Sequence, residues 1–238
     1  MKKTILLIVL GILTVFCICY GTAKHMGGIN PFSRSSWIED DSEDEMVNGK
    51  YAIDQKLAGF SELRIDARVM SITIEEGPEF SVEGSYNKTY LKPFIELKNN
   101  VLEIKQAEQK KSKINTGSQT CRLVIIVPSN AKLDRIKIDS NVGDIKLREL
   151  TAREIDIDTN VGQIDVRKVD FEECKCNSNV GEVEINPVKS IDEYNMSLST
   201  DVGQVNVGGN SFKRSYNFRV SGNMKIKVDT NVGEIKVK

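Results

Sequence analysis

Two cysteines and a series of aspartates are the residues whose types and spacing could support chemistry. Cys174 and Cys176 are separated by one residue, as a metal site or a redox pair could use. Three aspartates recur at one offset from a repeated phrase, where carboxylates could hold calcium or hydrolyse a glycan: Asp139, Asp158 and Asp229. The one histidine is His25, far from both groups. This excludes histidine-based triads and histidine-rich zinc sites.

The repeated phrase is Ser/Thr, Asn/Asp, Val, Gly. Its valine–glycine pairs are Val142–Gly143, Val161–Gly162, Val180–Gly181, Val202–Gly203 and Val232–Gly233. A phrase that recurs about every 20 residues predicts a stacked repeat architecture. Apolar residues alternate with polar ones on both sides of the phrase, which indicates strands with one buried face. The sequence therefore predicts an all-β solenoid whose repeat is strand, corner, strand.

The register of the apolar residues gives each residue of the phrase a role. The valine has the parity of the buried residues in the strand before it, so we expect it to fill the core. The strand after it is shifted by one residue, which requires a bend at the glycine. For the asparagine two alternatives are open: it tolerates the turn, or it stacks with its equivalents in a ladder of side-chain amides.

The same register assigns the cysteines and the aspartates. Cys174 and Cys176 occupy offsets that hold apolar residues in every other copy, so we expect both thiols to be buried, along with Cys121 in an apolar run. The aspartates alternate with lysines, which is typical of a solvated face. We therefore predict no catalytic, metal-binding or cofactor-binding residues and no cofactor. A polysaccharide-active enzyme that uses Asp158 is the alternative.

The solenoid is expected over residues 51–238, with irregular turns over 51–134 and regular repeats over 135–238. A degenerate copy of the repeat surrounds Val69, with Met70 in the place of the glycine. The last repeat carries Lys225, Lys227, Lys236 and Lys238. Lysines on an edge strand discourage strand addition, so we predict that this repeat is the exposed end of the stack.

Residues 1–21 are expected to be a signal or transmembrane segment, because two lysines precede an apolar run. The segment is either a retained single-pass anchor or a signal cleaved after Ala23. Positive residues before the run place the remainder outside the cytoplasm. Residues 22–50 form an acidic linker. The formal net charge of −1 does not indicate the basic surface that nucleic-acid-binding proteins use.

The interval before the last repeat holds an insertion that mixes aromatic and cationic residues. It is the candidate partner-binding loop, and its residues are Phe212, Lys213, Arg214, Tyr216, Phe218 and Arg219. The alternative is that it forms a hairpin packed over the core.

Residues 51–238 resemble the DUF4097 family, which is described as adhesin-like. The matching residues are Val127–Pro128, then Leu133 with Ile136 and Ile138, then the alternating phrase after each motif glycine. The resemblance implies a single-stranded right-handed parallel β-helix. It also implies kinship with exported or membrane-anchored proteins of Gram-positive envelope-stress systems. The chain departs from the family pattern by placing Asn-Val before most glycines, where Ser or Thr is more usual.

We therefore expect a non-enzymatic cell-surface solenoid that binds an envelope or extracellular ligand or has a structural role. The alternative is an envelope-stress accessory protein that contacts a membrane sensor. The part outside the membrane is expected to be monomeric.

Overall fold

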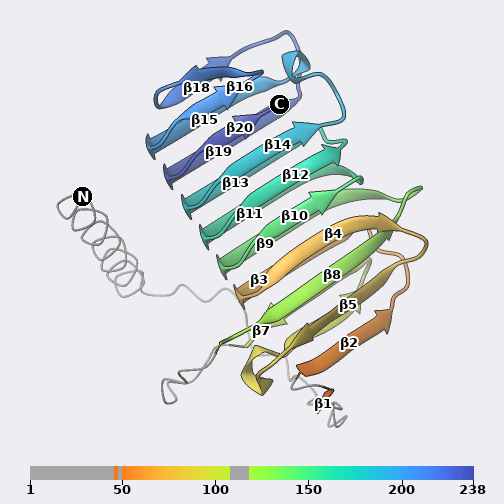
Figure 1. The fold of residues 1–238 in the computed structure, drawn as a ribbon. Helices are drawn as coiled ribbons and strands as arrows, with labels where there is room; N and C mark the ends of the chain where they lie inside the picture. The colour runs from red at the N-terminus through yellow and green to blue at the C-terminus, as the bar shows by residue number, and fades with distance from the viewer. Residues whose placement is uncertain (1–45, 48–49, 108–117) are drawn as a thin grey trace, which may run out of the picture. The chain divides into compact units, whose positions relative to one another are not determined.

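The computed structural model describes residues 46–47, 50–107 and 118–238, which belong to one compact unit, Asp44–Lys238. Within these residues the strands form two sheets, one of eleven strands and one of nine, here called the first and second sheet (Figure 1). None of the helices in the described ranges is long and apolar enough to cross a membrane. The predictions for residues 1–21 and for the linker as far as residue 45, including Ala23 and His25, lie outside the described residues. The predicted end of the linker at residue 50 is wrong, because Met46, Val47 and Lys50 lie in paired strands.

The first sheet holds the strands that follow each corner, with further strands at both ends. Its order in space is β1 (Met46–Val47), β2 (Lys50–Lys56), β5 (Ser81–Tyr86), β8 (Cys121–Pro128), β4 (Ser71–Gly77), β10 (Ile145–Arg148), β12 (Ile164–Val169), β14 (Val183–Pro187), β20 (Ile235–Val237), β16 (Val205–Val207) and β17 (Asn210–Phe212).

The second sheet holds the strands that precede each corner. Its order is β18 (Ser215–Phe218), β15 (Asn195–Val202), β19 (Lys225–Val232), β13 (Glu173–Val180), β11 (Thr151–Val161), β9 (Lys132–Val142), β3 (Glu62–Val69), β7 (Val101–Gln106) and β6 (Pro93–Lys98). Two short 3-10 helices, η1 (Thr89–Leu91) and η2 (Ile191–Glu193), join strands.

One strand of each sheet, joined by a corner, forms a rung. In spatial order the rungs are rung 1 (β3–β4), rung 2 (β9–β10), rung 3 (β11–β12), rung 4 (β13–β14), rung 5 (β19–β20) and rung 6 (β15–β16). They stack in parallel with residues at equal offsets side by side. Leu63 and Val69 of rung 1 pair with Ile136 and Val142 of rung 2. This confirms the all-β solenoid and the degenerate first copy.

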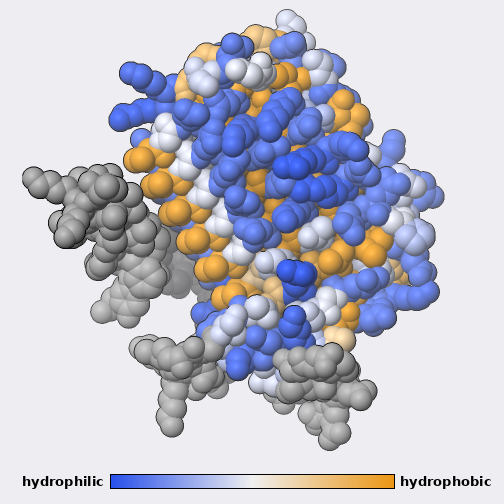
Figure 2. Space-filling view, in the orientation of Figure 1, coloured by the Kyte–Doolittle hydropathy of each residue, from blue (hydrophilic) through white to orange (hydrophobic). Residues whose placement is uncertain are grey.

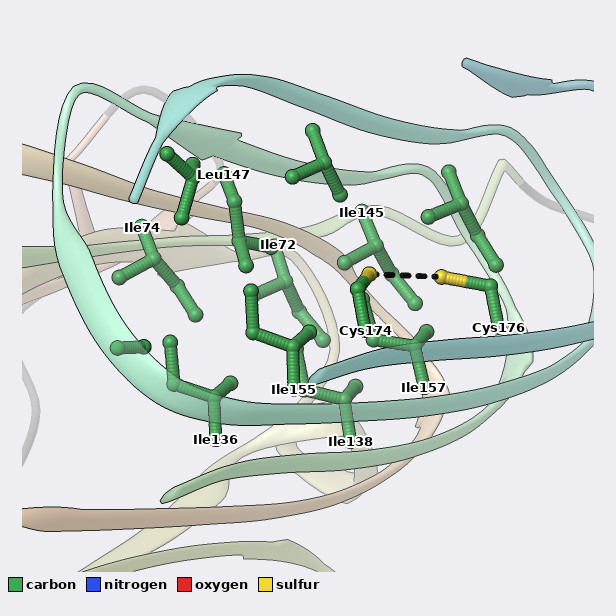
Figure 3. Packing of buried hydrophobic residues seen from close by; sticks show 14 of the residues in the cluster. Ile72, Ile74, Ile136, Ile138, Ile145, Leu147, Ile155, Ile157, Cys174 and Cys176 are labelled. Carbon is green, nitrogen blue, oxygen red and sulfur yellow. Dashed lines mark hydrogen bonds between the residues drawn. The ribbon is translucent and has the colours of Figure 1, made fainter. Parts of the chain in front are cut away.

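The core lies between the two sheets. Isoleucines from both sheets point toward one another in columns that follow the stack (Figure 3). Cys174 and Cys176 continue these columns in rung 4, and both have zero exposure. Cys121 is also buried. The predicted burial of all three thiols is confirmed.

The corner glycine is required by close approach as well as by backbone conformation. Gly162 has a φ of +149°, and a Cβ there would lie 2.1 Å from the carbonyl oxygen of Gly143. Its amide donates to the carbonyl of Val180 in the next rung at 3.1 Å. The hydrogen-bond ladder thus continues through the corner, where no side chain fits.

The prediction that the motif valines fill the core is wrong. Val161 is 40% exposed, whereas Thr159, two residues earlier, is 5% exposed. Asn160 and Val161 are both exposed, so the alternation ends at the threonine and parity along the strand no longer decides which way the valine points. The inward position at the corner is filled instead by small residues: Ala67, Ser140, Thr159, Ser178, Thr230 and Thr200.

The prediction that the last repeat forms the exposed end is also wrong. Rung 5, the last in sequence, lies between rung 4 and rung 6. The end of the stack is covered by the insertion instead. β18 pairs antiparallel with β15, and β17 pairs antiparallel with β16.

The irregular turns cover the other end. β7 and β8 add parallel strands beyond rung 1, and β6, β5, β2 and β1 add antiparallel strands outside them. Asn99 and Asn100, with φ of 51° and 67°, form the hairpin turn between β6 and β7 that their sequence indicates. The corner of rung 1 has no neighbouring corner on its outer side, and the side chain of the buried Gln106 pairs with it instead. The side-chain oxygen of Gln106 accepts from the amides of Arg68 and Val69 at 2.9 and 3.0 Å.

Replacement of a corner glycine is expected to destabilise the fold. Gly162→Ala should lower the free energy of unfolding by about 3 kcal/mol, because the new Cβ meets a backbone carbonyl and the positive φ is strained. Gly222→Ala is the control, since its Cβ would meet nothing closer than 3.6 Å. Urea denaturation checks both variants, and equal midpoints would contradict the role of the corner.

Paired aspartate substitutions test which valines are inside. Val166→Asp should abolish folding, because Val166 has zero exposure and the charge would be buried without a partner. Val161→Asp should lower the free energy of unfolding by only about 1 kcal/mol, as is usual at an exposed position. Circular dichroism during thermal unfolding distinguishes the two. Loss of structure in both variants would indicate that the side chain of Val161 is buried in the core.

Candidate functional site

The outward asparagines of the corner form a ladder. Asn160 donates to Asn141 at 2.8 Å, Asn179 donates to Asn160 at 2.6 Å, and Asn231 donates to Asn179 at 3.0 Å. The two middle amides, Asn160 and Asn179, thus each donate to one rung and accept from the next. Of the two alternatives for these residues, the structure selects the ordered ladder. Asp201, which replaces asparagine once, falls on rung 6 at the end of the series.

The valines next to the asparagines form an exposed apolar column, here called the valine ridge. In stack order it consists of Val69, Val142, Val161, Val180, Val232 and Val202. Exposure reaches 45% at Val142 and 62% at Val202. A column of apolar surface is visible along one edge of the stack (Figure 2). A hydrophobic side chain is therefore repeated at this surface position in every rung from 1 to 6. It is exposed in rungs 2, 3 and 6 and half-buried in rungs 1, 4 and 5.

A trench of about 340 Å³ lies on the outer side of the second sheet, beside the asparagine ladder. One wall is the ladder, and the other is the column of residues two positions earlier in each rung. In stack order that column reads Asp66, Asp139, Asp158, Asn177, Asp229 and Ser199. The aspartates predicted to line up do so. Asp66 lies in the same trench. It belongs to the degenerate first copy, so the pattern of the regular repeats alone does not reveal it.

Charge is unevenly distributed along the trench. Rungs 1 to 3 carry carboxylates in direct succession, whereas in rungs 4 and 6 neutral Asn177 and Ser199 donate to Asp158 and Asp229. Burial raises the pKa of Asp139, the nearby Lys137 at 3.5 Å opposes this, and the carboxylates of Asp158 and Asp66 add to the rise. Three stacked carboxylates therefore repel one another at neutral pH.

The cysteines lie outside this site and are unsuited to redox or metal chemistry. The Sγ atoms of Cys174 and Cys176 are 3.8 Å apart inside the core. The neighbouring thiol and burial raise the pKa of Cys176 well above its ordinary value, and burial raises the pKa of Cys121 to about 11. Thiolates are the reactive and metal-binding form, so both sites disfavour it. Across residues 46–47, 50–107 and 118–238, no cluster of metal-ligating side chains occurs.

The six residues of the predicted partner-binding loop lie at the end of the stack and do not line the trench. Phe212 in β17 and Tyr216 in β18 have ring centroids 4.6 Å apart, and both are packed against the core. Phe218 packs there as well, while Lys213, Arg214 and Arg219 are exposed. The aromatic residues thus pack against the core from two antiparallel strands, one in each sheet, and the cations remain on the surface.

The stacked carboxylates predict a pH-dependent stabilisation. Because the pKa of Asp139 is raised in the folded state, its ionised form opposes folding at neutral pH, and this penalty disappears below the ordinary aspartate pKa of about 3.9. Asp139→Asn should therefore raise the urea midpoint at pH 7 and leave it unchanged at pH 3. Asp134→Asn, on an exposed part of the same strand, is the control. A lower midpoint for Asp139→Asn at pH 7 would contradict the repulsion.

Comparison with known proteins identifies the fold. A solved structure described as a proposed cell adhesion protein from Clostridium sporogenes is 16% identical, with a TM-score of 0.56; the match covers 79% of this chain and 99% of that one. A proposed adhesin from Bacteroides fragilis is 14% identical, with a TM-score of 0.37, over 81% of this chain and 98% of that one. No curated protein matches the chain. The model of the Toastrack DUF4097 family matches residues 60–238, and the chain belongs to this family.

Proposed function

We propose that the protein is a non-enzymatic binding protein, displayed outside the cytoplasm on a membrane anchor at residues 1–21, and that its corner contacts a polymer of the cell envelope. The observation that carries the proposal is the repetition of one outward pair, an amide and a valine, on successive rungs, where it is exposed or half-buried. Strand spacing sets the repeat at about 4.8 Å. A surface with identical groups at a fixed interval suits a partner that is itself periodic, such as a glycan.

The chemistry of the corner supports the same partner. The valine ridge offers an apolar strip for the carbon-bound hydrogens of a polymer, and the trench beside it offers carboxylate and amide oxygens for hydroxyl groups. The amides are held in place by the ladder, so little side-chain entropy is lost on binding. The proposed adhesion function of the Clostridium protein agrees with a binding role.

Serine substitution of the ridge tests the proposal. Val142→Ser, Val161→Ser and Val202→Ser in one chain should weaken binding to isolated cell envelopes about tenfold, because three exposed apolar contacts are lost. Stability should change little, since the three side chains are 40–62% exposed. Cosedimentation of residues 44–238 with envelopes measures the binding.

A matched control is Val188→Ser, which removes a valine that is 64% exposed but lies off the ridge. Binding that is equally weakened by the control, or unaffected by the triple change, would contradict the corner as the contact surface. Binding that survives removal of glycans but is lost when membrane proteins are digested would instead support the membrane-sensor alternative.

A further inference from the structure

Rung 5 fills a slot between two rungs that precede it in sequence. β19 has seven register pairs with β13 on one side and seven with β15 on the other, and β20 pairs with β14 and β16. Without rung 5, the facing edges of rungs 4 and 6 would both present unpaired backbone groups, which are templates for strand addition. The slot is therefore a strand-accepting site built into the fold.

Charged residues of the rungs on either side of this slot select the rung that fills it. Lys236 contacts Glu182 of rung 4 at 2.7 Å, and Lys225 contacts Glu173 at 3.6 Å. Rung 6 contributes uncharged donors instead, as where Gln204 donates to the carboxylate of Glu234 at 3.2 Å. Placing rung 6 directly against rung 4 would leave Glu173 and Glu182 without these lysines.

The asparagine ladder specifies the same order. Asn160, Asn179 and Asn231 each donate toward rung 1, so the residue that stacks on Asn179 must carry an N–H for the ladder to continue. Asn231 of rung 5 has one, whereas Asp201 of rung 6 has none to donate. Asp201 can only end the ladder, and the slot beside rung 4 therefore selects rung 5.

The segment that returns the chain to the slot is short and exposed. It runs from residue 219 to residue 224, between β18 and β19, and Ser221, Gly222 and Asn223 are exposed. The side chain of Asn195 holds its middle: it donates to the carbonyl of Gly222 at 2.7 Å and accepts from the amide of Val220 at 3.1 Å. Met224, at the end of the segment, packs against the core. Six residues can span about 20 Å when extended.

We propose that the slot also takes rung 5 from a second copy of this chain, which gives a reciprocally strand-exchanged dimer. The charge pairs and the amide ladder recognise the inserted rung but do not depend on which chain supplies it. Exchange of an identical element preserves every contact of the closed form and changes only the return segment. Residues 225–237 are also synthesised after both walls, so the slot is open before its own insert is available.

Charge exchange between two full-length variants, purified in a mild detergent, tests this proposal. One variant carries Lys225→Glu and Lys236→Glu, and the other carries Glu173→Lys and Glu182→Lys. Alone, each variant places like charges together in its monomer and in its exchanged homodimer. A mixed exchanged dimer places opposite charges together in both slots. After joint refolding of an equal mixture, heterodimers should exceed either homodimer by about tenfold.

Size-exclusion chromatography with light scattering and two affinity tags measures the dimers. A chain with all four substitutions is the control and should return to the monomer–dimer ratio of the unaltered chain. In a chain with unaltered charges, Asn195→Ala should raise the dimer fraction about fivefold by releasing the return segment. Absence of heterodimers from the mixture, or Asn195→Ala remaining monomeric at every concentration, would overturn the proposal.

Discussion

The close approach of backbones at the corner is the constraint on which the rest of the structure depends. A Cβ on each motif glycine would lie within 2.1 Å of the corner carbonyl oxygen of the preceding rung, from Gly143 against Met70 to Gly203 against Gly233. Rungs can therefore keep strand spacing through the bend only if this residue lacks a side chain. The first rung is exempt, because no corner precedes it. Met70 fits there, and the side chain of Gln106 satisfies the backbone instead.

The same tight corner produces the exposed surface. Small residues such as Thr159 occupy the inside of the bend, and the next two residues point outward. Stacking then places equivalent side chains about 4.8 Å apart, within reach of amide hydrogen bonds. The valine ridge and the asparagine ladder are thus products of the packing geometry. The ionised carboxylate of Asp139 opposes stability, because it is partly buried and stacked between the carboxylates of Asp66 and Asp158.

The order of the rungs follows side-chain complementarity, although consecutive elements are usually neighbours in space. Lys236 needs the carboxylate of Glu182, and the ladder must end at Asp201, so the last repeat lies inside the stack. The insertion that contains Phe212 and Tyr216 then covers the end that lysines were expected to protect. Each sheet edge at this end is thus covered by an added antiparallel strand, which protects it as a row of edge lysines would.

The sequence by itself determined the strands, the corner, the degenerate first copy, the buried cysteines and the family, because period-two alternation and a recurring glycine are local signals. It also placed the aspartates in one column. Only the tertiary structure decided that Val161 is outside, that the asparagines form a ladder, and that rung 5 precedes rung 6 in space. Parity holds along a straight strand but not across a bend, and stacking order depends on contacts between residues far apart in the chain.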